Sequence, residues 1–244
     1  MKPVLSYILT PIFFFFFGLI LAVFHVIQVI VLNLFRHKWH DRSVVSLNFW
    51  LMSCMYILGT RIQYKGFDQK LDKVPTLFIS NHQSMWDIPP VMWKLRKWRL
   101  KYIAKASLSR FIPSISYNLR HGGSLTIDRS DREGSVQKIK EFAAFIQKND
   151  LSICIYPEGT RSRDGIVKSF KPSGIDAILE VLPNIQVVPV AIKNTGKIDN
   201  NGKFNKRIGV KTEFTMLPAR RLGRENLNDE LEQIRKEIIE VLKN

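Results

Sequence analysis

Two long runs without charged residues open the chain. Residues 3–35 contain no Lys, Arg, Asp or Glu, and five consecutive Phe residues occupy positions 13–17. A helix needs about 20 apolar residues to cross the hydrocarbon core of a bilayer, so this run is long enough to span one, with Pro11 as the expected bend. A second charge-free run covers residues 43–60. The pattern predicts that residues 1–60 form membrane-embedded helical segments.

The charges beside the two runs predict how the helices lie. The connector at residues 36–42 is rich in cations and contains Trp39, and the second run is followed by Arg61 and Lys65. Basic flanks tend to stay on the cytoplasmic side of a membrane, so both ends of the second run are expected on one side. We therefore expect a helical hairpin within one leaflet; a single crossing by the first helix is the alternative.

After residue 65, short β-branched runs alternate with amphipathic stretches. Strands are expected at residues 76–80, 124–127, 151–156 and 185–192. Helices are expected at residues 85–98, 136–146, 173–181 and 227–241. This alternation predicts an α/β fold, a layered sheet-and-helix domain over residues 61–244. The stretch 194–206, rich in Asn, Gly and Lys, is expected to be an exposed loop.

The amino-acid composition indicates what kind of molecule the protein binds. Lys and Arg outnumber Asp and Glu by 37 to 21, for a net charge of +16, which favours an anionic partner. Sixteen Phe and five Trp suit contact with an anionic phospholipid membrane better than with nucleic acid, and no nucleic-acid-binding motif is present. The strip at 93–102, which interleaves cations with Trp, Leu and Tyr, is expected to seat the domain on lipid. Cys54 and Cys154 lack metal-ligand spacing, so no zinc site or disulfide framework is expected.

Polar clusters follow two of the predicted strands. In open α/β sheets, chemistry collects beyond the carboxyl ends of strands. His82 follows the strand at 76–80, and Asp87 comes five residues later, where a turn into a helix would return the carboxylate to the imidazole. An imidazole oriented in this way is a general base for an alcohol supplied by the substrate. Ser84 is a poor candidate for an acyl-serine nucleophile because no GxSxG-type elbow surrounds it.

Five polar blocks occur in a characteristic order. They are Asn81-His82…Asp87, Lys105-x-x-Leu108, Gly123-Ser-Leu-Thr-Ile-Asp-Arg129, Pro157-Glu-Gly-Thr-Arg-Ser162 and Val188-Pro-Val190. Together they resemble the glycerolipid acyltransferase family, and the 1-acylglycerol-3-phosphate acyltransferases in particular, over about residues 61–215. The chain departs from the family pattern at residues 171–174, and at residues 124–126, where bulkier side chains are common.

The resemblance implies a reaction and a site. The reaction is transfer of a fatty acyl group from acyl-CoA or acyl-carrier-protein to the 2-hydroxyl of 1-acylglycerol 3-phosphate (lysophosphatidic acid), which gives phosphatidic acid in phospholipid biosynthesis. No metal or other cofactor is expected. The implied location is a membrane, at its cytoplasmic face, and the inner membrane if the source is bacterial. By the match, His82 deprotonates the hydroxyl and Asp87 orients His82.

The resemblance also implies a substrate-binding set. Its members are Lys105, Arg129, Glu158, Gly159, Thr160 and Arg161. The three cations would hold the phosphate, a task that suits the planar fork of Arg. Gly159 would allow a tight turn, and Glu158 would orient Arg161 or contact the glycerol.

Other interpretations remain open. Within the family, the acceptor could be glycerol 3-phosphate, a lysophosphatidylethanolamine-like lipid or a lyso-aminolipid. A non-catalytic membrane lipid-binding protein is a candidate from a different class, although the intact His82 and Asp87 argue against it. Lys105 could instead be a solvated surface residue, Arg129 could pair with neighbouring Asp residues, and Glu158 could pair with Arg161.

Overall fold

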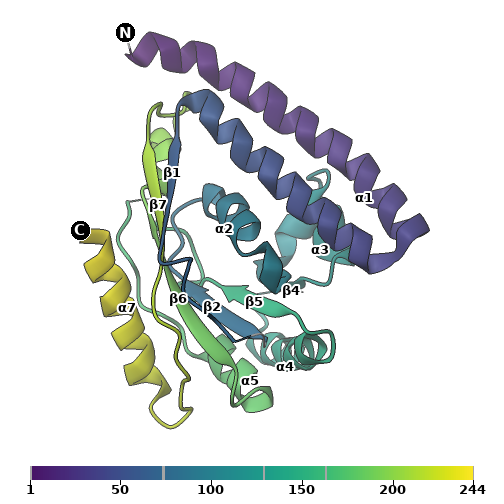
Figure 1. Ribbon diagram of the computed structural model, residues 1–244, viewed down its shortest axis with the longest axis vertical. Coiled ribbons are helices and arrows are strands. Elements are labelled where there is room, and N and C mark those ends of the chain that lie inside the picture. Colours follow the sequence, from purple (N-terminus) through teal and green to yellow (C-terminus); the bar gives the residue numbers. More distant parts are fainter. Residues whose placement is uncertain (1, 73–74, 129, 163, 244) are drawn as a thin grey trace.

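The computed structural model describes residues 2–72, 75–128, 130–162 and 164–243, and places a long helical hairpin across one face of a mixed sheet (Figure 1). The hairpin is α1 (Lys2–Cys54), which turns back so that its two arms lie side by side. A straight helix of this length would extend about 80 Å. Instead, Leu21 and Phe24 of the first arm pack against Leu47 and Leu51 of the second. The hairpin shape expected from the sequence is confirmed.

The reversal of α1 lies in the basic connector. The facing positions of the two arms are equidistant from about residue 36, so the chain turns there and not at Pro11, which lies inside the first arm. Among the described residues, Val4–Phe35 is long and apolar enough to cross a membrane by length and composition, with a mean hydropathy of 2.6. Only 11% of that window is buried, so most of it faces outward.

The sheet contains seven strands in the described part of the chain, in the order β1-β7-β6-β2-β5-β3-β4. They are β1 (Arg61–Lys65), β2 (Thr76–Ser80), β3 (Leu100–Lys105), β4 (Leu125–Ile127), β5 (Ser152–Ile155), β6 (Gln186–Lys193) and β7 (Lys211–Met216). The strands from β6 to β4 pair in parallel, whereas β7 is antiparallel to β6. The carboxyl ends of β2, β3, β4, β5 and β6 therefore share one edge of the sheet.

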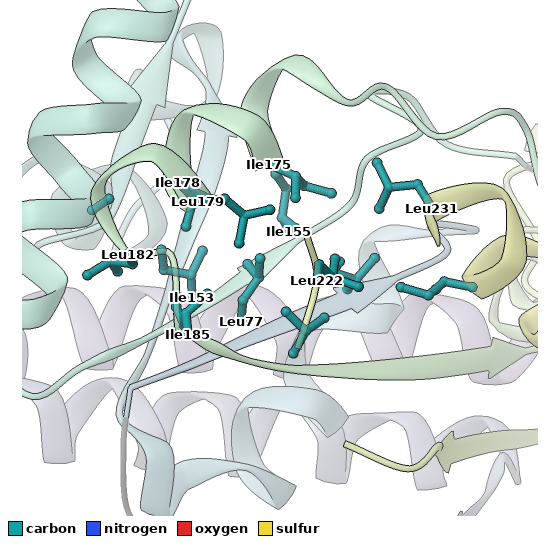
Figure 2. Packing of buried hydrophobic residues seen from close by; sticks show 14 of the residues in the cluster. Leu77, Ile153, Ile155, Ile175, Ile178, Leu179, Leu182, Ile185, Leu222 and Leu231 are labelled. Carbon is teal, nitrogen blue, oxygen red and sulfur yellow. The ribbon is translucent and has the colours of Figure 1, made fainter. Parts of the chain in front are cut away.

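Helices cover both faces of the sheet. They are α2 (Ile88–Lys94), α3 (Ile115–His121), α4 (Arg132–Lys148), α5 (Ser173–Val181), α6 (Thr195–Ile198) and α7 (Leu227–Lys243). Side chains of β2 alternate between the faces, as strand geometry requires. Leu77 and Ile79 pack with α4, α5 and α7, and Figure 2 shows Leu77 among residues of α5 and β5. Phe78 packs on the other face with α2 and the second arm of α1.

The expected alternation of strands and helices is confirmed, with five omissions. β2 and α5 begin and end where the sequence predicts, whereas the sequence does not predict β1, β3, β7, α3 and α6. The strip at 93–102 does not form one surface strip, because its second half enters β3, where Lys101 and Tyr102 are buried. The stretch 194–206 is not wholly exposed: Thr195 and Ile198 are fully buried. The proposed domain boundary at residue 60 stays a prediction.

Candidate active site

The candidate general base lies in the turn after β2. Asn81 anchors the start of this turn, because its side-chain amide exchanges two hydrogen bonds with the backbone of Ile192 in β6, at 2.8 and 2.7 Å. His82 follows, and the chain then enters the short helix η2 (Met85–Asp87), which Ser84 caps. This return places Asp87 Oδ2 2.7 Å from His82 Nδ1. The pairing expected from the His-x4-Asp spacing is present.

The carboxylate of Asp87 is fully buried and saturated with donors. Its Oδ2 accepts hydrogen bonds from the backbone N–H groups of Gln83 (2.8 Å) and Ser84 (3.0 Å) as well as from His82. Its Oδ1 accepts a hydrogen bond from the hydroxyl of Thr195, at the start of α6. A buried carboxylate needs such partners, and their geometry fixes its orientation. With Nδ1 donating to Asp87, the lone pair of His82 is on Nε2, and 15% of the side chain is exposed.

Aromatic rings form one wall of the site. The ring of Tyr156, just beyond β5, stacks on His82 with the centroids 4.2 Å apart and the planes 17° apart. Tyr102 of β3 stacks behind Tyr156 at 6.1 Å. Burial raises the pKa of the Tyr156 phenol well above its ordinary value and that of the Cys154 thiol to about 12. Both groups therefore stay protonated near neutral pH and do not compete with the imidazole for a proton.

Glu158 holds the loop after β5 against the turn after β2. It is 2% exposed. Its Oε1 accepts from the backbone N–H of His82 (2.7 Å), and its Oε2 accepts from the hydroxyl of Ser162 (2.5 Å) and the backbone N–H of Lys168 (2.9 Å). In return, the backbone N–H of Ser162 donates to the carbonyl of His82 at 2.7 Å. Glu158 thus positions His82 from the backbone side, and both carboxylate oxygens bind protein donors rather than Arg161.

The next three residues of that loop are less buried than Glu158. Gly159 has a φ of +71°, a left-handed conformation that favours glycine. The side chain of Lys171 lies over it, because a Cβ built on Gly159 would be 3.5 Å from Lys171 Nζ. Thr160 is exposed, and Arg161 is half-buried at the wall of a cavity.

The candidate phosphate ligands lie at the same edge of the sheet as His82. Lys105 is the last residue of β3 and is exposed. Arg161 belongs to the loop after β5, the strand between β2 and β3. Because neighbouring strands are about 4.8 Å apart, Lys105 begins about 10 Å across the sheet from the strand that carries His82. Neither cation makes a salt bridge with any residue that the structure describes. Arg129 lies outside the described residues.

A cavity of about 1030 Å³ lies between the hairpin and the sheet domain. The cavity is lined by Met85 and Trp86, which follow His82 in the chain. Arg161, in the loop after β5, also lines the cavity. The second arm of α1 contributes a stripe at helical spacing, namely Val44, Leu47, Asn48 and Leu51, and β3 contributes Leu100, Lys101, Tyr102 and Ala104. Asp41 also lines the cavity, with its Oδ1 2.6 Å from Lys101 Nζ. The cavity is mostly apolar along its walls and polar where the hairpin meets the start of β3.

Asp199 is a residue of this site that the motifs did not indicate. It follows α6, and its carboxylate accepts hydrogen bonds from Ser84 Oγ (2.6 Å), Trp86 Nε1 (3.0 Å) and Lys206 Nζ (3.1 Å). Burial raises the pKa of Asp199, but these donors together lower it more, so the pKa lies below its ordinary value. The ring of Trp86 in turn packs edge-on against Phe13 of α1. Asp199 therefore links the turn that carries His82 to the hairpin.

The sequence did contain a signal for Thr195 and Asp199. Both follow the carboxyl end of β6, as His82 follows β2 and Glu158 follows β5. The rule that functional residues collect beyond the carboxyl ends of strands, applied above to β2 and β5, therefore holds for β6 as well. In the part of the chain that the structure describes, no group of three or more His, Cys, Asp or Glu residues is placed to hold a metal ion.

The site combines a buried carboxylate–imidazole pair, at the carboxyl edge of an α/β sheet, with an apolar cavity. These features are those of an enzyme class that uses a general base to activate an alcohol beside an apolar substrate. A family model described as Acyltransferase matches residues 61–193, more than half of the chain. The chain belongs to this acyltransferase family.

Individual relatives of the chain are also named acyltransferases. The chain is similar to a 1-acyl-sn-glycerol-3-phosphate acyltransferase of Cocos nucifera, with 32% identity over 141 residues, which cover 58% of this chain and 44% of the relative. It is also similar to the enzyme of that name from Saccharomyces cerevisiae, with 25% identity over 204 residues, which cover 80% of this chain and 66% of the relative. The chain thus spans about half to two thirds of the length of these relatives.

A solved structure has the same fold. It is the crystal structure of the 1-acyl-sn-glycerophosphate (LPA) acyltransferase PlsC from Thermotoga maritima, which superposes with a TM-score of 0.74 at 22% sequence identity. The match covers 100% of this chain and 95% of that chain. The likeness therefore extends through the helical hairpin as well as the sheet.

Proposed function

We propose that this protein transfers a fatty acyl group from a thioester donor, acyl-CoA or acyl-carrier-protein, to the 2-hydroxyl of 1-acylglycerol 3-phosphate, giving phosphatidic acid. The observation that carries this proposal is the His82–Asp87 pair at 2.7 Å, immediately before residues that line a large apolar cavity. The named activity of the relatives supports the choice of substrate.

The chemistry follows from the orientation of His82. Nε2 removes the proton from the 2-hydroxyl of the acceptor as its oxygen attacks the thioester carbonyl, and Asp87 stabilises the resulting imidazolium. A tetrahedral oxyanion forms and collapses when the C–S bond breaks. The imidazolium then returns its proton to the departing thiolate, so the products are an ester and a free thiol. Ser84 takes no part as a nucleophile, because its side chain is fully buried and its hydroxyl donates to Asp199.

The cavity supplies a place for an acyl chain. From Asp41 to Leu51, the second arm of α1 lines it over eleven residues, which corresponds to a rise of about 15 Å along the helix. An extended chain that enters beside Trp86 would run along this arm towards the Asp41–Lys101 pair. Apolar walls suit such a chain because its burial is favourable by about 0.8 kcal/mol per CH₂ group.

The free cations supply a place for the phosphate. Arg161 and Lys105 lie at the edge of the sheet that carries His82, and Arg129 is proposed to join them. An Arg fork can bind two oxygens of a phosphate monoester at once, and the double negative charge of that group suits a set of cations. This arrangement favours 1-acylglycerol 3-phosphate over acceptors whose phosphate carries a further substituent.

The hairpin supplies the membrane contact. Its first arm exposes large apolar side chains such as Val4, Phe15 and Val26, at 66, 65 and 56%. Such an area is suited to lipid, and its burial would place the cavity beside the bilayer. We propose that the protein acts at the cytoplasmic face of a membrane.

Thiol release by the purified full chain tests the proposal. We expect release from acyl-CoA or acyl-carrier-protein with 1-acylglycerol 3-phosphate as acceptor, and weaker release with glycerol 3-phosphate or lysophosphatidylethanolamine. His82→Ala should lower the rate by about 10²- to 10⁴-fold, because positioned proton transfer contributes that much. His121→Ala, which removes an exposed histidine of α3, is the matched control and should retain the rate. Full activity of His82→Ala would refute the mechanism, and no release with any acceptor would favour a lipid-binding protein.

A further inference from the structure

One aromatic side chain on the sheet domain is almost wholly exposed. Phe111 lies in the turn between η4 (Ala106–Ser109) and α3, and its exposure is 97%, the largest of any apolar side chain described as exposed. Its φ of +67° is in the left-handed region, which a bulky side chain rarely adopts. The backbone therefore holds the ring outward in a strained conformation.

The turn itself is firmly attached to the hairpin. The backbone N–H of Ile112 donates to Ser116 Oγ at 2.8 Å, and the backbone N–H of Ser114 donates to Nδ1 of His25 in α1 at 3.2 Å. Ile112 also packs against the cluster that joins the two arms of α1. The residues that follow Phe111 are thus anchored, and the ring projects from a turn that is held against the hairpin.

The inner side of the same turn forms a wall of the cavity. Leu108 and Ile112 line it, and so does Ile115 at the start of α3. The turn therefore has two apolar surfaces. One faces the proposed acyl-chain site, and the other is the outward ring of Phe111.

All charged residues near the turn in the sequence are basic, and two of them, Arg99 and Lys101, pair with Asp41 of α1. Between Asp87 and Asp128 the chain contains eight Lys and Arg residues and no Asp or Glu. One of the eight is Arg110, which precedes Phe111 and is exposed. A protruding aromatic ring among cations fits the interface of an anionic bilayer, where the ring meets acyl chains and the cations are attracted to the head groups.

We propose that the turn at Arg110 and Phe111 is a second bilayer contact, in which Phe111 inserts below the head groups of an anionic phospholipid membrane. This inference rests on the membrane association proposed above, and adds a contact on the sheet domain that is separate in sequence from the hairpin. With both contacts engaged, the cavity wall formed by Leu108 and Ile112 lies against the bilayer. An acyl chain can then pass between lipid and cavity beside this turn without crossing water.

The depth of position 111 in a bilayer can be measured directly. Phe111→Cys in the full chain is labelled with an environment-sensitive fluorophore, a selective step because Cys54 and Cys154 are buried. The protein is placed in vesicles of phosphatidylcholine and phosphatidylglycerol whose acyl chains carry bromine, which quenches only fluorophores at that depth. Two matched positions calibrate the result. Val26→Cys is on the outward face of α1, and Phe145→Cys is an exposed phenylalanine of α4 on the opposite face of the sheet.

We expect the label at 111 to be quenched as strongly as the label at 26, and at least twice as strongly as the label at 145. Quenching at 26 but only background quenching at 111 would overturn this inference and leave the proposed function intact. That result is also the one expected if Phe111 binds a protein partner, since the vesicles contain none. Background quenching at both 26 and 111 would overturn the membrane contact as a whole, whereas the catalytic proposal is tested separately by thiol release.

Discussion

At the scale of single residues, Thr195 is the partner of Asp87 that the motifs did not reveal. Its hydroxyl supplies the donor to Oδ1 of a carboxylate that is fully buried. Thr195→Val keeps the shape of the side chain and removes that donor. We expect kcat to fall about tenfold with little change in KM, because an unpaired buried oxygen costs about 1–3 kcal/mol and Asp87 then positions His82 less well.

Thr195→Ser is the matched control, since it restores the hydroxyl and should recover most of kcat. Thermal unfolding of the three proteins separates a loss of positioning from a loss of folding. An unchanged kcat in Thr195→Val would show that the two backbone N–H groups hold Asp87 without help from α6.

Asp199 predicts a dependence of stability on pH. Hydrogen bonds from Ser84, Trp86 and Lys206 lower its pKa in the folded protein despite its burial. A carboxyl group with a lowered pKa stabilises the fold above its unfolded pKa, near 4, and this contribution is lost as the pH falls through the folded pKa. Asp199→Asn should therefore be less stable than the wild type at pH 7, by about 1–2 kcal/mol.

The measurement is the unfolding of both proteins in detergent micelles at pH 7 and at pH 3. The difference between them should be large at pH 7 and should shrink at pH 3, where the wild type has begun to lose the same contribution. A difference that is equal at both values would mean that Asp199 acts through packing and not through its charge.

Residue-level prediction from the sequence succeeded where chemistry is local. The His82–Asp87 pair spans five positions of one turn, so spacing alone indicated it. Glu158 is expected to orient Arg161 or contact the substrate, but its Oε1 accepts a hydrogen bond from the backbone N–H of His82, 76 positions earlier in the chain. Tyr156, Thr195 and Asp199 reach the site from other strands. Only the strand order shows which of those strands lie beside β2.

At the scale of elements, the second arm of α1 and β3 are the two walls of the cavity. Because β3 points its carboxyl end to the edge that carries His82, Ala104 lies nearer to the site than Ser124, which is level with Tyr102. Two positions along a strand correspond to about 7 Å. Both residues line the cavity and are half-buried. Ala104→Phe and Ser124→Phe should therefore block it at two different depths.

We expect both substitutions to shift the preferred acyl chain to shorter lengths, and Ala104→Phe to shift it further. Competition between acyl donors of graded length, with the product chains identified by mass spectrometry, measures the shift. Equal preference in all three proteins would show that the chain does not enter this cavity.

Element prediction from the sequence failed where burial hides the pattern. β3 was not predicted because its basic residues indicated a surface segment, yet Lys101 is buried in ion-pair contact with Asp41 of α1. The start of the stretch 194–206 is polar in composition, but Thr195 is buried because it serves Asp87. In both cases a polar residue is buried by a partner distant in the sequence, which periodicity does not show.

At the scale of the whole molecule, the sequence indicated the sheet, the helices and the hairpin, but not the order of the strands in the sheet. Alternating strands and helices predicted an α/β sheet, and two apolar runs around a basic connector predicted the hairpin. The order β1-β7-β6-β2-β5-β3-β4 and the antiparallel β7 depend on which buried strand faces pack best, and the short apolar sequences of strands such as β2 and β5 do not specify their neighbours. The cavity depends on that order as well, since one wall comes from each part of the molecule.

The way α1 is packed has a practical consequence for anyone who wishes to prepare this protein without detergent. Deleting the first sixty residues would remove one wall of the cavity. It would also remove Phe13, which is 0% exposed and packs against Trp86. The hairpin is thus a structural part of the cavity and not a detachable segment. A water-soluble version is better obtained by exchanging outward residues such as Phe15 for polar ones, with the inward stripe left as nature has it.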